Sequence, residues 1–321
     1  MPRDRTFVIG TLAAVLAAVM FGMLGPLARF GAEDGIEGVA FVAWRAALGV
    51  LFVSTLLVAR RGVGESAAAI GALSSRNKAS LVIASCMGLA LNVAMFSAFG
   101  LIQIALALML FYTYPAGVVV VDVAMGHERI TASRLAALGL STLGVVLVLV
   151  GGLEPAPGVP VAPLGVVLGL AAAAAQVVFV TISRHGYRSV PADGATLVNL
   201  SVSLVGGVVI ALAIGQGDGL TAPLRSLDPW PVLLLAGIVA AGMSSLLFLT
   251  AIRLIGGTRT GILMLLEPVV GVALAALWLG ETLGPVQVTG GALVLLGALV
   301  LQVRSDPGHD AVVEPAAGPV V

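Results

Sequence analysis

The sequence predicts an all-α integral membrane protein with ten transmembrane helices, arranged as two inverted five-helix repeats. Three observations lead to this fold class. The chain of 321 residues is 59% hydrophobic and only 10% charged, whereas soluble domains carry about 25% charged residues. Ten apolar segments have the length that a helix needs to cross a bilayer, roughly 20 residues. A hydrophobic block in the first half of the chain also recurs in the second half, as it does in many transporters.

Each predicted span is an apolar run bounded by residues that are typical of turns. The first two runs, for example, are followed by the loops GAEDGIEG and RRGVGES. All of these loops are short, so we expect no water-soluble domain between the spans. The ten predicted spans are 7–29, 38–58, 80–100, 103–123, 132–151, 164–183, 195–215, 231–252, 260–279 and 284–303.

The positive charges predict the orientation. An even number of spans places both ends of the chain on one side of the membrane. Of the 16 Lys and Arg residues, only Arg29 and Arg225 fall on the other side, while Arg45 lies inside the second span. Loops rich in Lys and Arg remain in the cytoplasm. We therefore expect a multi-pass protein of the inner or plasma membrane with cytoplasmic N- and C-termini.

The internal repeat predicts two related halves of opposite orientation. Pro115 and Pro268 lie 153 residues apart in matching apolar blocks, and LARFG at 27–31 is similar to ISRHG at 182–186. Each repeat has five spans, so the second must enter the membrane from the opposite face, which is the geometric basis of alternating access. The predicted parts are a first repeat, 7–151, a second repeat, 164–303, and a disordered cytoplasmic tail, 304–321.

Two copies of one motif carry a family resemblance. LMLFYTYP, followed by GHERIT and a glycine-rich fifth helix, recurs as ILMLLEP followed by LGETLGPVQVTGGALVLLG. This pattern resembles the drug/metabolite transporter superfamily, specifically its members with two EamA domains, over about 7–303. The resemblance implies a secondary transporter that exports a small metabolite, such as an amino acid or an amphipathic drug-like compound. It also implies that helices 5 and 10 are peripheral, where they can mediate a homodimer.

Glu267 is the sharpest candidate for a functional group. It lies deep in the ninth span, directly before Pro268. Proline removes the backbone hydrogen bond to Met264 and kinks the helix, and a carboxylate in a span is costly unless it has a function or a partner. Glu267 can bind a substrate amine, carry a coupled proton, or do both in turn. The alternative is that it only pairs with a cation or caps loose backbone groups.

Arg45 is the second charged candidate, and Trp44 precedes it in the second span. A guanidinium can hold a substrate carboxylate through two hydrogen bonds. It can instead neutralise Glu267 in the empty protein or extend to the membrane surface. A cavity that offers both Arg45 and Glu267 would suit a zwitterion such as an amino acid.

The remaining candidates are polar or aromatic residues within the spans. Each either lines a cavity or forms an interhelical contact worth about 0.6–2 kcal/mol. We expect Asp122, near the cytoplasmic end of the fourth span, to be an interfacial charge, and Gly22, Gly25 and Pro26 to break the first span. The candidate substrate-binding residues are Phe21, Trp44, Arg45, Asn92, Tyr112, Tyr114, Gln176, Asn199, Ser245 and Glu267.

The sequence lacks the motifs that mark several other classes of function. The single cysteine, Cys86, excludes an intramolecular disulfide framework and a thiolate metal site. His127, His185 and His309 are scattered over loops and tail, so we expect no metal and no cofactor. There is no phosphate-binding loop for ATP and no basic block for nucleic acid. The partners expected are a small-molecule substrate, protons and the lipid bilayer. The alternatives are a membrane-embedded lipid-modifying enzyme and a passive channel.

Overall fold

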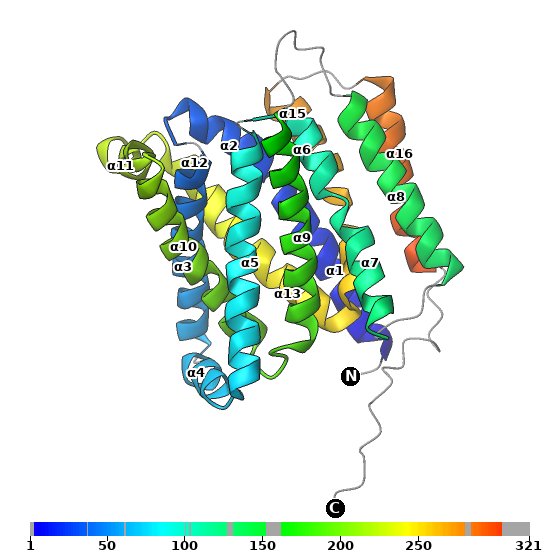
Figure 1. The fold of residues 1–321 in the computed structure, drawn as a ribbon, viewed down its shortest axis with the longest axis horizontal. Coiled ribbons are helices and arrows are strands. Elements are labelled where there is room, and N and C mark those ends of the chain that lie inside the picture. The colour runs from blue at the N-terminus through cyan, green and yellow to red at the C-terminus, as the bar shows by residue number, and fades with distance from the viewer. Residues whose placement is uncertain are drawn as a thin grey trace, which may run out of the picture.

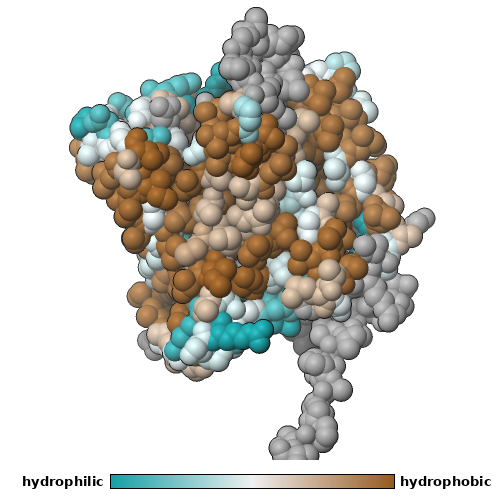
Figure 2. Space-filling view, in the orientation of Figure 1, coloured by the Kyte–Doolittle hydropathy of each residue, from teal (hydrophilic) through white to brown (hydrophobic). Residues whose placement is uncertain are grey.

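The structure is a computed structural model that describes residues 3–36, 38–60, 62–99, 101–102, 104–126, 131–151, 162–279 and 284–303. In this part of the chain the regular elements are helices (Figure 1). Among the described residues, nine segments are long and apolar enough to cross a membrane, and Pro285–Val300 adds a shorter apolar helix. Figure 2 shows the expected surface, a broad hydrophobic band between two hydrophilic ends. The predicted all-α membrane fold is confirmed. Glu128, Glu281 and the predicted tail lie outside the described residues.

The first half supplies five spans, two of which are each made of two helices in succession. A short helix, α4, follows the second span. The helices are α1 (Arg3–Gly22) and α2 (Leu24–Glu33) for the first span, α3 (Gly38–Ala59) for the second, α4 (Val63–Gly71), α5 (Ser75–Phe99) for the third, α6 (Ile104–Phe111) and α7 (Tyr114–Ala124) for the fourth, and α8 (Ala132–Gly151) for the fifth.

The second half repeats this plan with two differences: its first span is unbroken, and its third contains a π-helical segment, η1. A short helix, α11, precedes that third span. The elements are α9 (Pro163–His185), α10 (Ala192–Ala213), α11 (Gly217–Arg225), the third span made of α12 (Trp230–Leu234), η1 (Leu235–Met243) and α13 (Ser244–Ile255), the fourth made of α14 (Gly257–Met264) and α15 (Leu266–Leu279), and α16 (Pro285–Val303).

The two halves interlock through equivalent contacts. In the first half α1 packs against α13 and α15 of the second half, and its counterpart α9 packs against α5 and α7 of the first. The second spans, α3 and α10, pack against each other, as do the fifth spans, α8 and α16. The α8–α16 pair stands at one side of the bundle (Figure 1). Exchanging the two halves therefore reproduces the same set of helix pairs.

The halves also run in opposite directions. We call the face of the bundle at which α1 begins and α13 ends the terminal face, because Gly10 of α1 lies against Ile255 at the end of α13. The last turn of α9 lies at this same face, where Arg184 approaches Gly256. Thus α1 starts where α9 ends, and α16 also ends at the terminal face (Figure 1). The other end of the bundle is called the distal face.

The breaks in the fourth spans come from proline. α6 ends at Phe111 and α7 begins at Tyr114, just before Pro115, while α14 ends at Met264 and α15 begins at Leu266, just before Pro268. Proline has no backbone N–H and crowds the preceding turn, so it cannot sit inside an uninterrupted helix without cost. The predicted interruption of the first span is likewise found, at Met23.

Glycine brings α8 and α16 into close contact. A Cβ atom added at Gly144 of α8 would lie 2.6 Å from the Gly290 carbonyl oxygen, and one added at Gly290 would lie 2.6 Å from the Gly144 carbonyl oxygen. Gly297 approaches Ser141 in the same way. Small residues allow such close backbone approach, on which helix association in a membrane depends.

We expect Gly290→Ala to lower the thermal unfolding temperature of the purified protein, because overpacking a close contact costs about 1–3 kcal/mol. Gly139→Ala on α8 is the matched control, since an added Cβ there has no neighbour within 4 Å. That control should be neutral or gain up to about 1 kcal/mol from helix propensity. Equal unfolding temperatures for the two variants would contradict the close α8–α16 contact.

Candidate functional site

Side chains from five spans converge around Glu267, at the level of the helix breaks. The two breaks place the first turns of α7 and α15 there, and the free N–H groups at the start of a helix carry a partial positive charge. The group around Glu267 is called the central cluster. Its members are Arg45 of α3, Asn92 of α5, Tyr112 and Tyr114 beside the break between α6 and α7, Gln176 of α9, and Glu267 of α15.

Glu267 is half-buried and lies in the first turn of α15. The hydroxyl of Tyr112 donates a hydrogen bond to its carboxylate, and the positive charge of Arg45 acts on it electrostatically. The first span approaches closely on the other side, since a Cβ atom added at Gly22 would lie 2.9 Å from the Glu267 carbonyl oxygen. Gly22 thus serves close packing beside Glu267, where the first and ninth spans are both broken.

Arg45 is held by two neighbours on α5. Its side chain is buried, and Nη2 donates a hydrogen bond to Asn92 Oδ1. Asn92 in turn donates from Nδ2 to the Gly88 carbonyl oxygen at 2.7 Å, which fixes the orientation of the amide. The guanidinium carbon also lies 5.9 Å from the centre of the Phe96 ring, at the range of a cation–π interaction. These contacts hold a desolvated cation without a direct ion pair to Glu267 among the described residues.

The π-helical segment η1 packs directly against the turn of α3 that carries Arg45. A Cβ atom added at Gly237 would lie 2.3 Å from Leu48 Cβ and 3.1 Å from the Arg45 carbonyl oxygen. Gly242 similarly faces Phe52. Any larger residue would push η1 away from α3. Segments of π-helix are frequent at functional sites, and here the segment lies behind a buried charge.

Tyr114 and Gln176 form the counterpart of Glu267 and Phe21 in the repeat. Both side chains of the first pair are buried, and they share a hydrogen bond. In the second pair, Phe21 instead packs edge-on against Phe248, with ring centres 6.1 Å apart. The charge of Glu267 is therefore present in one half of the repeat only, and the polar tyrosine–glutamine pair occupies the equivalent place in the other.

Two of the predicted site residues form their hydrogen bonds outside the central cluster. Trp44 donates from Nε1 to the Leu220 carbonyl oxygen at 3.2 Å, towards α11 at the distal face. Asn199 accepts a 2.5 Å hydrogen bond from Ser85 and bonds Tyr187, near the terminal face. Ser245 is half-buried in the first turn of α13 and makes no hydrogen bond within the described part of the chain.

The sequence interpretation missed two residues. Phe96 covers the guanidinium of Arg45, and its spacing of four from Asn92 on one helix is the signal that it shares that face. Asp122 is not an interfacial charge, so that expectation was wrong. Its side chain is 1% exposed and pairs with Arg184 and Thr258, because α7 turns it inward between α9 and α14.

The described residues bring together no set of metal ligands. No group of three or more His, Cys, Asp or Glu side chains there has the proximity to hold a metal ion. Cys86 is free and exposed on α5. His127 and His309 lie outside the described residues. The central cluster instead offers one cation, one carboxylate, hydroxyl and amide groups, which are the groups that bind a small polar molecule.

Comparison with known proteins agrees with this arrangement. A protein of Archaeoglobus fulgidus described as an uncharacterized transporter is 25% identical over 293 residues, which cover 91% of this chain and 95% of that protein. A protein of Salmonella typhimurium described as a probable amino-acid metabolite efflux pump is 28% identical over 219 residues, or 63% and 66% of the two chains. A crystal structure at 18% identity shares the fold, with a TM-score of 0.71 over 93% of this chain and 98% of that one.

The family assignment rests on both halves of the chain. Residues 8–150 and residues 163–303 each match the EamA-like transporter family. The two matches together cover nearly all of the helical bundle, and they identify a transporter of the drug/metabolite type rather than an enzyme. The chain therefore belongs to the EamA-like transporter family and is a multi-pass membrane protein.

Proposed function

We propose that the protein is a secondary-active exporter of a small zwitterionic metabolite of the amino-acid type, which binds in the central cluster. The observation that carries this proposal is the opposition of Arg45 and Glu267. The first comes from α3 of the first half and the second from α15 of the second half. They act on each other electrostatically, yet no direct ion pair joins them in the described structure. A zwitterion between them would contact both halves at once.

Each of the two charged side chains can bind one end of a zwitterion. A guanidinium binds a carboxylate through two parallel hydrogen bonds, and Asn92 and Phe96 hold Arg45 in place for that contact. A carboxylate binds an ammonium group, and Tyr112 fixes Glu267. The first turns of α7 and α15 meet at the same level, and helix starts of this kind favour anionic groups of a substrate.

Transport by alternating access follows from the inverted halves. Two halves of opposite direction, with the site between them, allow one arrangement open to each side of the membrane. The distribution of Lys and Arg over the loops favours a cytoplasmic location for the terminal face. Export is supported by the name of the Salmonella relative, an efflux pump for an amino-acid metabolite. A passive channel is the competing mechanism. In a channel, unlabelled substrate on one side of a vesicle membrane would not accelerate the movement of labelled substrate from the other side.

The proposed coupling proton binds Glu267. A carboxylate that binds either a proton or a substrate amine can exchange one for the other. This exchange would link substrate efflux to proton entry. Tyr112 and Arg45 both act on this carboxylate, so neutralising it changes the balance of charge throughout the central cluster.

Glu267→Gln should abolish transport driven by a pH gradient, because the amide cannot accept the coupled proton. Exchange of substrate across the membrane should persist at high substrate concentration with a weaker apparent affinity, because the amide oxygen still accepts a hydrogen bond from the substrate ammonium group. The assay uses proteoliposomes and a labelled amino acid chosen by thermal-shift screening of the purified protein. Glu267→Asp is the conservative control and should retain part of the driven transport. Driven transport that persists in Glu267→Gln, or exchange that is lost even at saturating substrate, would contradict the proposed coupling role of Glu267.

Arg45→Gln should remove the preference for a free carboxylate, because the guanidinium is its proposed partner. The measurement compares thermal stabilisation by an amino acid and by its methyl ester, which lacks the carboxylate. The unchanged protein should prefer the amino acid by about tenfold or more, equal to about 1.4 kcal/mol. Arg225→Gln is the control, since this arginine is 67% exposed at α11. A preference that persists in Arg45→Gln would place carboxylate recognition elsewhere.

Asn199→Ala should destabilise the protein without changing ligand affinity, because its hydrogen bonds join Ser85 and Tyr187 rather than the central cluster. Interhelical hydrogen bonds in membranes contribute about 0.6–2 kcal/mol, so the unfolding temperature should fall by a few degrees. Asn92→Ala is the matched comparison, and it should weaken binding of the same ligand. Weaker ligand binding by Asn199→Ala would contradict this prediction and indicate that Asn199 belongs to the binding site.

A further inference from the structure

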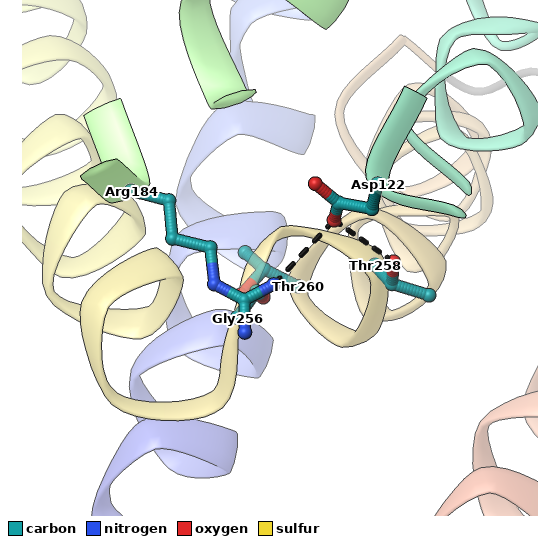
Figure 3. Close-up of polar contacts among 5 residues, drawn as sticks. All are labelled: Asp122, Arg184, Gly256, Thr258 and Thr260. Carbon is teal, nitrogen blue, oxygen red and sulfur yellow. Dashed lines mark hydrogen bonds and ion pairs between the residues drawn. The ribbon is translucent and has the colours of Figure 1, made fainter. Parts of the chain in front are cut away.

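A second buried group of polar side chains lies at the terminal face, away from the central cluster. Arg184 Nη1 of α9 lies 3.5 Å from Asp122 Oδ2 of α7, and Thr258 Oγ1 of α14 donates to the same oxygen at 3.2 Å (Figure 3). Asp122 is 1% exposed and Thr258 is 3% exposed. We call these three residues the Asp122 group. It joins the two halves, because α7 belongs to the first and α9 and α14 to the second.

The Asp122 group lies at the end of a seam between α7 and α14. Farther inside the bundle, an added Cβ at Gly261 of α14 would lie 3.5 Å from Pro115 of α7. Next to the group, Gly257 packs against Val118. All eight residues of α14 are buried, whereas the described residues of α15 beyond Pro268 are half-buried or exposed. The ninth span is thus fully buried in its terminal half and less buried in its distal half.

The connection between α13 and α14 is built to admit Arg184. Gly256 alone joins the two helices, with a φ of +84° that favours glycine. An added Cβ there would lie 2.9 Å from the guanidinium carbon of Arg184. The Thr260 hydroxyl donates to the Gly256 carbonyl oxygen at 2.7 Å and holds this turn (Figure 3). The turn therefore leaves the space through which Arg184 reaches Asp122.

The sequence does not repeat the group at the corresponding positions of the other half. By the spacing of the repeat, Arg184 corresponds to Arg29, whereas Asp122 corresponds to Ala275 and Thr258 to Ala105. Opening the terminal face must separate α7 from α14 and break the contacts that Asp122 makes with Arg184 and Thr258 across the seam.

We propose that the Asp122 group is a lock that keeps the transport route closed at the terminal face. Release of Asp122 from Arg184 and Thr258 is then the step that opens the terminal face to a ligand. The lock rests on the proposed alternating access, but it makes a structural claim that needs no substrate to test.

The test measures the accessibility of a cysteine on α14. Ile262→Cys, in a Cys86→Ser background, places a single thiol at a position that is 1% exposed and is not part of the Asp122 group. The purified full-length chain is labelled with a charged maleimide that does not enter closed protein. Asp122→Asn should raise the labelling rate by about tenfold, within the range of typical conformational coupling. Arg184→Gln should have the same effect, and the two changes together should add little.

Asp218→Asn is the matched control, because Asp218 and Arg225 form an ion pair at the same 3.5 Å distance but are 95% and 67% exposed. It should leave the labelling rate unchanged. The lock is overturned if Asp122→Asn and Arg184→Gln both keep the thiol closed while the unfolding temperature shows a folded protein. It is equally overturned if Asp218→Asn raises labelling as much. Increased labelling in a protein that shows no transport would retain the lock and reject the proposed function.

Discussion

The cost of placing charge in hydrocarbon governs this structure more than any other constraint. A charged side chain within a span is tolerated only where it meets a partner or a polar cavity. Arg45 meets this requirement through Asn92 and Phe96, and Asp122 meets it through Arg184 and Thr258. Arg259 at the start of α14 lies 5.0 Å from the ring centre of Phe7. The partners sit on neighbouring helices, so each charge also determines which helices must lie together.

The fold class could be predicted from the sequence because the length and apolarity of the spans leave few alternatives. The breaks could be predicted as well, since proline interrupts a helix wherever it falls inside one. Glu267 and Arg45 were recognisable because a charge stands out in apolar surroundings. Their proximity was not recognisable, because α3 and α15 lie far apart in the chain and only the packing of the bundle brings them together.

The inward face of each span was harder to predict. In a soluble protein the polar residues mark the outer face of a helix. In these spans both faces are apolar, so the spacing of apolar residues along the helix says little about which face points inward. Asn92 and Asn199 therefore looked alike, although one holds Arg45 and the other bonds Ser85 and Tyr187. Asp122 was misjudged for a related reason, since its nearness to a span end says nothing about the direction in which it points.

The connection of a single residue between α13 and α14 has a mechanical consequence. Two helices joined through Gly256 have little freedom to shift independently, so a displacement of α14 at the terminal face is transmitted to α13 and to η1, which continues it. Since η1 packs on α3 beside Arg45, the same displacement reaches the guanidinium near the middle of the bundle. The third span of the second half thus acts as a lever that links the closure of one face to the position of a charge deep within the protein.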